Sequence, residues 1–329
     1  TLEQFFISRA YKTLGAGKIY HSQAPPWAPT SQIEPENWDF YYPSKYISHP
    51  YQIRAPKEVI YPKEVKNKSR PGDRDGTGES SWWTWGPIPV SDEKMADYHI
   101  VDWANYQLEL EHEKPFFLAV GTWKPHDPWE VPQKYFDLYP MEDVVLPVHK
   151  KNDLDDAFDH GRRWIQKWVE NNNQWKKVIQ SYAAAISFSD AMLGRLIDKI
   201  KKSSYADNTI IVLWSDHGMH MGEKENIEKF TLWERSTRVP LILYFPKVIQ
   251  PGSRCNQPVS LMDIYPTLVE LTGFEKPNHL DGNSLVPQIK DPNTLTSPVI
   301  SSYQFTWTNK PYGAHAVRSL NYRYIYYPE

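Results

Sequence analysis

An acid, an imidazole and a glycine follow one strongly apolar run of the chain. The run 208–214 is rich in β-branched and apolar side chains, which predicts a buried central strand. Ligands of open α/β sheets bind just outside the carboxyl ends of the strands, so Asp216 and His217 are expected at the mouth of a site. Lys229 follows thirteen positions after Asp216, and a loop could bring its ammonium to the same place. By themselves, two such residues are more often a turn cap and a backbone-bonded histidine.

Two more strand ends carry cations or imidazoles. Lys18 and His21 close a short strand expected at 15–21, although a lysine and a histidine three apart are ordinarily surface and turn residues. His126 follows a second buried strand, expected at 114–121, and has a proline on each side. Because proline fixes φ, we expect this ring to be held in place before a ligand arrives. The alternative is a turn histidine that packs against a neighbouring tryptophan.

Helices and strands alternate along the chain. Apolar residues recur at helical spacing in several segments, and Gly273 is a stop signal at the end of one of them. A helix that leads directly into a strand is typical of doubly wound folds, so we expect an α/β protein with a large, mainly parallel sheet flanked by helices. The expected helices are 2–10, 91–110, 131–139, 161–169, 175–201 and 260–273, and a further buried strand is expected at 238–245.

Two segments depart from this alternation. Residues 22–91 are rich in proline and aromatic side chains without a sustained period, which predicts a long insertion that is either functional or a decorated surface lobe. Residues 297–327 show strand-like alternation, which predicts the start of a smaller antiparallel sheet. We therefore expect an α/β core over 1–296 and the start of a C-terminal subdomain over 297–329.

The composition excludes several classes of protein. A formal net charge of −3 argues against a general binder of nucleic acid or anionic membranes. No apolar stretch reaches the roughly 18 residues that a membrane span needs. The chain has 14 Trp and 21 Tyr, which is weak support for a protein that stacks aromatic rings on sugars. The single cysteine, Cys255, excludes a disulfide within the chain.

Six segments in the same order resemble the motifs of the type I, formylglycine-dependent sulfatases, with most similarity to iduronate-2-sulfatase and its bacterial relatives. The segments are 17–21, 124–126, 215–229, 238–241, 260–267 and 318–325. The resemblance implies an alkaline-phosphatase-like α/β fold. It also implies a divalent metal, usually Ca²⁺ with Mg²⁺ as the alternative, and a formylglycine nucleophile that attacks a sulfate ester. Asp216 and His217 would be metal ligands.

The resemblance also implies roles for the other candidates. Lys18 and Lys229 would hold the sulfate oxygens, because fixed cations stabilise the negative charge that spreads over them as the S–O bond breaks. His21 would lie beside the formylglycine hydrate and help to collapse the sulfated intermediate. His126 would contact the sulfate and protonate the leaving alcohol, a task suited to a group that titrates near neutrality.

The chain departs from the family at its most diagnostic position. The family's Asp-Asp pair on the first strand and its Cys- or Ser-x-Pro-x-Arg sequence at the start of a following helix are not in it. Cys255 lies in a different context that favours a structural thiol. Ca²⁺ takes six to eight oxygen ligands, and the chain offers one convincing carboxylate. We therefore expect a segment before Thr1 to supply the nucleophile and the other carboxylates, and we expect the polypeptide as given to be inactive alone.

Two alternatives remain open at this point. One is a phosphodiesterase or phosphonate hydrolase of the alkaline phosphatase superfamily. The other is a catalytically inactive relative that binds glycans. The expected partner is a sulfated, glycosaminoglycan-like saccharide, and the family implies a periplasmic, extracellular or lysosomal location.

Overall fold

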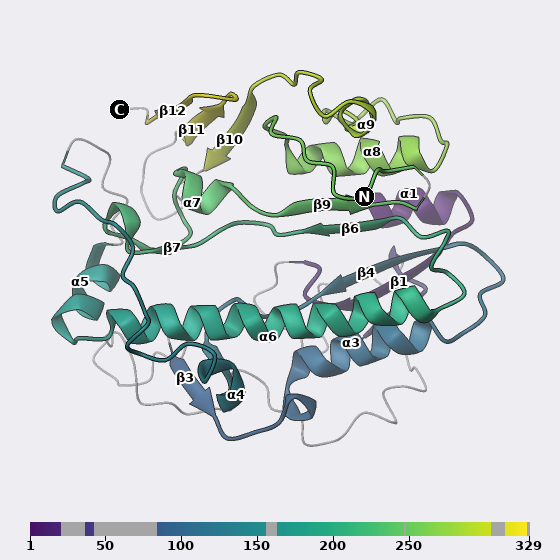
Figure 1. Ribbon diagram of the computed structural model, residues 1–329. Helices are drawn as coiled ribbons and strands as arrows, with labels where there is room; N and C mark the ends of the chain where they lie inside the picture. Colours follow the sequence, from purple (N-terminus) through teal and green to yellow (C-terminus); the bar gives the residue numbers. More distant parts are fainter. Residues whose placement is uncertain (21–36, 43–83, 156–162, 247, 304–312, 328–329) are drawn as a thin grey trace. The chain divides into compact units, whose positions relative to one another are not determined.

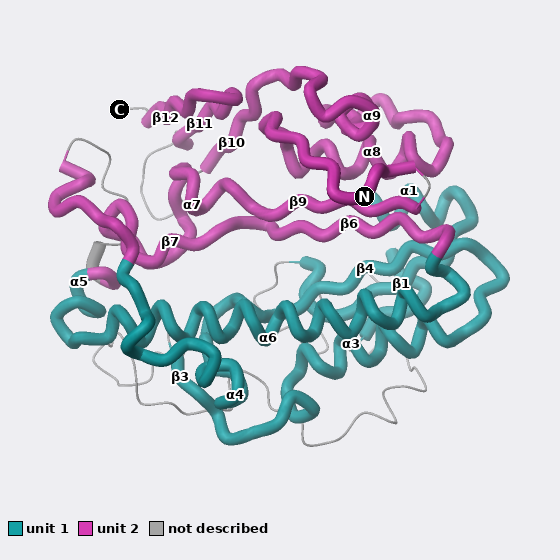
Figure 2. Tube along the Cα trace, viewed as in Figure 1, with its two compact units in different colours: residues 1–146, 167–206 teal, residues 147–166, 207–329 magenta. Residues whose placement is uncertain are grey.

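The computed structural model describes residues 1–20, 37–42, 84–155, 163–246, 248–303 and 313–327 of the chain (Figure 1). The chain forms two compact units (Figure 2). Unit 1 comprises Thr1–Leu146 and Lys167–Ala206, and unit 2 comprises Pro147–Gln166 and Asp207–Glu329. His21 and most of the 22–91 insertion lie outside the described residues. The expected domain boundary near residue 296 stays a prediction.

A parallel sheet of three strands is the centre of unit 1. Its order is β2 (Phe40–Tyr42), β1 (Lys12–Gly17) and β4 (Phe116–Gly121). β1 begins and ends earlier than the 15–21 strand expected from sequence, because it pairs with β4 from Lys12 to Gly17 and the two strands end together. Lys18 is therefore the first residue beyond the sheet edge, on the side where ligands of parallel sheets bind.

The alternation of side chains along β1 gives the sheet two different faces. Leu14 and Ala16 are fully buried against helix α3 (Ala96–Gln107), whose Trp103 is also fully buried. The opposite face is covered by Trp38 and Tyr41. Burying a large apolar side chain stabilises a fold by about 1.5–3 kcal/mol, so this core fixes the strand ends.

The long helix α6 (Trp175–Lys202) packs against α3 and against a second, two-stranded parallel sheet (Figure 1). That sheet pairs β3 (Trp85–Ile88) with β5 (Trp129–Pro132). The expectation of a helix at 131–139 is wrong in its first part. Val131 and Pro132 belong to β5, and helix α4 (Gln133–Phe136) begins only after them. The other helices described in unit 1 are α1 (Leu2–Ser8), η2 (Asp92–Lys94) and α5 (Arg163–Asn171). The first residues of α5 belong to the 147–166 segment of unit 2.

The strand before Asp216 differs from its prediction. β6 (Ile211–Trp214) pairs antiparallel with β9 (Leu241–Tyr244). Within the described part of unit 2, neither strand is fully buried, and Trp214 is 49% exposed. The expectation that both strands are buried is wrong within this unit, because an apolar run predicts a strand but does not determine which neighbours cover it.

The rest of unit 2 contains short elements and a small antiparallel sheet. The sheet has the order β10 (Val299–Tyr303), β11 (Ala314–Arg318) and β12 (Arg323–Tyr326), which confirms the predicted C-terminal antiparallel strands. Gly273, at φ +80°, follows helix α8 as predicted. The other elements are β7 (His220–Met221), η3 (Glu223–Glu225), β8 (Ile227–Glu228), α7 (Glu234–Thr237), η4 (Leu261–Asp263), α8 (Ile264–Leu271) and α9 (Val286–Lys290).

The parallel sheet, its flanking helices and the small antiparallel sheet agree with the expected alkaline-phosphatase-like fold class. Among the described residues, no helix is both long and apolar enough to cross a membrane.

Candidate active site

Two glycines let the ends of β1 and β4 approach each other closely. Gly17 has φ +76°, and a Cβ atom there would lie 2.1 Å from the carbonyl oxygen of Gly121. A Cβ atom on Gly121 would lie 2.0 Å from the carbonyl oxygen of Lys18, whose own N–H donates to the Gly121 carbonyl at 2.7 Å. Only glycine fits at both positions, and the result is that Lys18 leaves β1 directly beside the loop that follows β4.

Trp123 is close to both candidate groups of unit 1. The Lys18 ammonium is 5.2 Å from the centre of the Trp123 ring, within the range of a cation–π interaction. The His126 ring is 5.0 Å from the same tryptophan, centroid to centroid. The structure therefore brings Lys18 and His126 to one aromatic side chain, and the predicted packing of His126 against a neighbouring tryptophan is also observed.

The His126 imidazole is oriented by its neighbour in the chain. Nδ1 lies 2.7 Å from the backbone carbonyl oxygen of Asp127 and 3.1 Å from its carboxylate. Because a carbonyl oxygen can only accept, Nδ1 carries the proton, and Nε2 is protonated only in the imidazolium form. The side chain is 17% exposed. These contacts to Asp127 orient the ring, and the expected contribution of the flanking prolines stays a prediction.

Lys124 belongs to the same motif as His126, but its side chain is buried and contacts the protein backbone. It is only 2% exposed, and its ammonium donates to the backbone carbonyl of Pro128. Burial lowers the pKa of Lys124 to about 8, while the carboxylates of Asp97, Glu130 and Asp127 oppose that shift. The ammonium therefore stabilises the 122–129 loop from inside.

Asp97 connects this loop to helix α3. Its two carboxylate oxygens accept the backbone N–H groups of Trp123, at 2.8 Å, and Lys124, at 2.9 Å. Burial raises the pKa of Asp97, and these two hydrogen bonds and the nearby lysines oppose the rise. Sequence reasoning missed Asp97; the available signal was an acid on the apolar side of a predicted helix.

The predicted pair in unit 2 lies two residues beyond β6, as expected. The Nδ1 atom of His217 is 2.9 Å from the carbonyl oxygen of Gly218, and its Nε2 is 3.5 Å from a carboxylate oxygen of Asp216. The Asp216 side chain is 64% exposed. An accessible carboxylate next to an oriented imidazole can bind a cation.

Ser236 joins this turn to the segment that carries Lys229. The carbonyl oxygen of Ser236 accepts the N–H of Gly218 at 2.8 Å, and its hydroxyl donates to the carbonyl of Lys229 at 2.8 Å. A Cβ atom on Gly218 would lie 2.0 Å from the Arg235 carbonyl oxygen, so this contact requires glycine. The turn that carries Asp216 and the backbone of Lys229 therefore both contact Ser236. Sequence reasoning did not identify Ser236.

A buried hydrogen-bond chain continues from Ser236. Its hydroxyl lies 2.9 Å from that of Thr231, which lies 2.9 Å from Nε2 of the fully buried His220. The other ring nitrogen of His220 is 2.9 Å from the Glu223 carbonyl oxygen. Buried polar groups that are satisfied in this way make a segment rigid.

The described residues fit the implied metal only in part. No group of three or more His, Cys, Asp or Glu side chains in the described ranges is arranged to hold a metal ion. Asp216 and His217 are two candidate ligands, and Ca²⁺ takes six to eight, so these two residues alone do not make a calcium site. Cys255 is free and exposed, which contradicts the expected structural thiol, because an exposed sulfur packs in no core.

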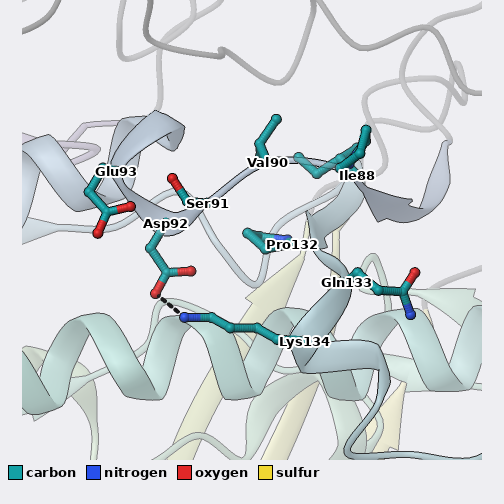
Figure 3. A pocket seen from close by; sticks show the side chains of 9 residues that line it. Ile88, Val90, Ser91, Asp92, Glu93, Pro132, Gln133 and Lys134 are labelled. Carbon is teal, nitrogen blue, oxygen red and sulfur yellow. Dashed lines mark hydrogen bonds and ion pairs between the residues drawn. The ribbon is translucent and has the colours of Figure 1, made fainter.

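A separate pocket lies in unit 1, lined by none of the predicted site residues (Figure 3). Its volume is about 430 Å³, and residues 88–93 and 132–134 line it. The carboxylate of Asp92 and the ammonium of Lys134 form an ion pair of 2.7 Å at its wall. An open pocket whose ammonium already pairs with a neighbouring carboxylate does not by itself indicate a ligand.

Comparison with known families accounts for the order of these motifs. The Sulfatase family profile matches residues 11–274, and the profile of the N-sulphoglucosamine sulphohydrolase C-terminal region matches residues 222–329. The chain belongs to the sulfatase family. Its membership confirms the resemblance read from the six segments.

Two curated sulfatases and one solved structure illustrate the relationship. A sulfatase of Formosa agariphila is 35% identical over 335 residues, which cover 100% of this chain and 62% of that protein. Human iduronate 2-sulfatase is 26% identical over 321 residues, covering 84% of this chain and 55% of that protein. The phosphonate monoester hydrolase of Silicibacter pomeroyi aligns with a TM-score of 0.74 at 18% identity, over 99% of this chain and 71% of that chain, which shows a common fold alone. The chain thus spans less than two thirds of both curated relatives.

Proposed function

We propose that the complete protein to which this sulfatase chain belongs hydrolyses sulfate esters. The observation that carries the proposal is the arrangement of Lys18 and His126 around Trp123, in a chain whose family profile covers most of its length. A cation and an imidazole beside one aromatic wall suit an anionic ester whose leaving group needs a proton.

The roles follow from the charges that change during the reaction. A sulfate monoester is an anion, and its negative charge spreads over the sulfur-bound oxygens as the bond to the leaving alcohol breaks. In the proposal, Lys18 and Lys229 bind these oxygens from two different loops. His126 donates a proton from Nε2 to the leaving alcohol, since Nδ1 is committed to Asp127. Removing one such electrostatic contact costs about 10²–10³-fold in rate in other enzymes.

The proposed reaction also needs a nucleophile and a metal ion, which depend in part on residues outside the described ones. We infer a formylglycine from a Cys or Ser in a segment that precedes Thr1, with His21 beside its hydrate. Asp216 and His217 would contribute two ligands to a Ca²⁺ or Mg²⁺ ion, which would polarise a sulfate oxygen when bound. The remaining ligands would come from the same preceding segment, which is therefore a necessary partner of this chain.

The proposed substrate is a sulfated saccharide. This rests on similarity to iduronate 2-sulfatase and on the number of aromatic side chains, 14 Trp and 21 Tyr, some of which could stack on sugar rings. The proposal includes a periplasmic, extracellular or lysosomal location, which rests on membership of the sulfatase family.

A phosphonate or phosphodiester hydrolase is the second candidate. The structural similarity to a phosphonate monoester hydrolase favours it, because the two share a fold and a fold can host several chemistries. A third candidate is an inactive relative that binds glycans.

The test uses the complete protein. Its kcat/KM is measured on aryl sulfate, phosphate diester and phosphonate monoester substrates with the same leaving group, and the mass of the nucleophile peptide reports conversion of Cys or Ser to formylglycine. We expect formylglycine and a dominant sulfatase rate. A dominant phosphodiester or phosphonate rate would replace the proposal by the second candidate, and an unmodified nucleophile peptide with no turnover would favour the third. Metal content of Asp216→Ala, measured by mass spectrometry, should fall below that of the parent protein.

A further inference from the structure

Arg323, at the start of β12, holds the segment that follows Lys229. Its guanidinium donates to one carboxylate oxygen of Glu234, from Nη2 at 2.7 Å and from Nε at 3.0 Å. Its Nη1 donates to the backbone carbonyl of Leu232 at 2.6 Å. The Arg323 side chain is 15% exposed and the Glu234 side chain is 40% exposed, so the guanidinium is largely shielded from water while its carboxylate partner is half-exposed.

The same segment is also packed on the small sheet. Leu232 is 3% exposed and forms a core cluster with Ala314 and Ala316 of β11. The ring of Phe230 lies 6.1 Å from that of Tyr303, at the end of β10. Residues 230–234 are therefore attached to the sheet by an apolar anchor, an aromatic contact and arginine side chains, of which Arg323 makes the shorter contacts to Glu234.

Lys229 lies directly before this attached segment. Its carbonyl accepts the Ser236 hydroxyl on the other side, at 2.8 Å. The backbone of Lys229 is thus held between Ser236 and the sheet. Displacement of residues 230–234 would therefore move the Cα atom from which the Lys229 side chain extends.

We infer that Arg323 is a positioning residue for Lys229, acting through Glu234 and the Leu232 carbonyl. The inference rests on the proposed function only where it concerns sulfate binding. In this inference, the C-terminal sheet affects anion binding indirectly. It holds the segment next to Lys229 and does not touch the ligand. A lysine at position 323 could not replace the arginine, because its single ammonium cannot reproduce the planar fork that reaches both acceptors.

Arg318 is a matched control within the same sheet. It is the registered partner of Arg323 across β11 and β12, and its Nε lies 3.3 Å from the same Glu234 oxygen. Its Nη1 donates to the carbonyls of Ser319 and of Leu320, the latter at 3.0 Å, which belong to the β11–β12 turn. Arg318→Gln therefore removes a similar charge without removing the bond to Leu232.

The first measurement is hydrogen–deuterium exchange on the complete protein, which does not depend on activity. We expect Arg323→Gln and Glu234→Gln to speed exchange in peptides covering 227–237 by about tenfold, a size typical of one lost charge-assisted bond. Exchange in 264–271 should be unchanged, which shows that the variants fold. Arg318→Gln should give a smaller increase in 227–237. Unchanged exchange in both first variants, or an equal effect of Arg318→Gln, would overturn the inference.

The second measurement is inhibition of the enzyme by inorganic sulfate. We expect the inhibition constant to rise on the order of tenfold in Arg323→Gln, with KM affected more than kcat, because a misplaced cation binds the anion more weakly. In a Lys229→Ala background, Arg323→Gln should add little, since both changes remove one interaction. Additive losses would overturn the positioning role. If the complete parent protein lacks sulfatase activity, the proposed function fails, and the exchange measurement alone decides whether Arg323 positions Lys229.

Discussion

The hydroxyl of Ser236 donates a 2.8 Å hydrogen bond to the backbone carbonyl of Lys229, while the Ser236 carbonyl accepts the N–H of Gly218. One serine thus sets the spacing between the turn that carries Asp216 and the loop that carries Lys229. Gly218, Lys229 and Ser236 all belong to unit 2.

Ser236→Ala tests this spacing. Ser236 is buried, so losing its hydroxyl leaves the Lys229 carbonyl and the Thr231 hydroxyl each without this bond, and we expect a loss of about 1–3 kcal/mol in the free energy of unfolding. Activity of the complete enzyme should fall with it. Ser253→Ala is the control, because the Ser253 hydroxyl makes an exposed 2.8 Å bond to the Gln250 carbonyl and should cost far less. Equal unfolding midpoints for the two variants would contradict the prediction.

His126→Ala tests the proton donor. Loss of a general acid typically costs about 10²–10⁴-fold. We expect that loss in kcat for sugar sulfates and a much smaller one for aryl sulfates, because a phenolate leaves without a proton. His149→Ala is the control, since its ring is exposed and belongs to a different unit. Similar losses on both substrate classes would remove the acid role from His126.

Lys124→Met tests the buried ammonium. The variant leaves the carboxylates of Asp97, Asp127 and Glu130 without their shared cation. It also removes the donor to the buried Pro128 carbonyl. A buried group left unsatisfied costs about 1–3 kcal/mol, and we expect a loss of that order in urea unfolding of the complete protein at neutral pH. Lys134→Met, which removes an ammonium that is 61% exposed, should cost at most about 1 kcal/mol. A loss no larger than that of Lys134→Met would contradict the prediction.

The pH dependence of stability tests the same group. Burial lowers the pKa of Lys124 from 10.5 to about 8 in the folded protein. Between these values the unfolded chain binds more protons than the folded one, so the Lys124 contribution to stability rises with pH from about 8 to 10.5 and is lost as pH falls through 8. The slope is at most about 1.4 kcal/mol per pH unit. We expect the stability difference between the parent protein and Lys124→Met to grow over this window in urea unfolding at several pH values. A constant difference would contradict the lowered pKa.

Gly121→Ala and Gly194→Ala should have opposite effects. A Cβ atom on Gly121 would lie 2.0 Å from the Lys18 carbonyl oxygen, so the backbone must shift, at a cost of about 1–3 kcal/mol or more. A Cβ atom on Gly194, within α6, would meet nothing within 4 Å outside its own helix turn. Alanine there should stabilise the helix by about 0.5–1 kcal/mol. Thermal unfolding of the two variants distinguishes them, and a stabilised Gly121→Ala would show that Lys18 is not held as described.

The sequence alone was sufficient wherever a local pattern determines the outcome. The wide apolar stripe of 175–201 predicted α6 to within one residue, because helical periodicity is a property of neighbouring residues. The motif order predicted the sulfatase family, since several short segments at fixed spacings are specific together. The position of Asp216 just beyond a strand followed from the end of an apolar run.

Only the tertiary structure decided the features that depend on distant partners. The burial of Lys124 depends on Asp97, which reaches the loop from 27 positions earlier in the chain. The half-exposed state of Trp214 depends on which strands lie beside β6, and the apolar run carries no information about them. Arg323 meets the segment after Lys229 across 89 positions, through the pairing of β11 with β12 and the burial of Leu232. Local propensity cannot determine such contacts, because their free energy comes from groups that only folding brings together.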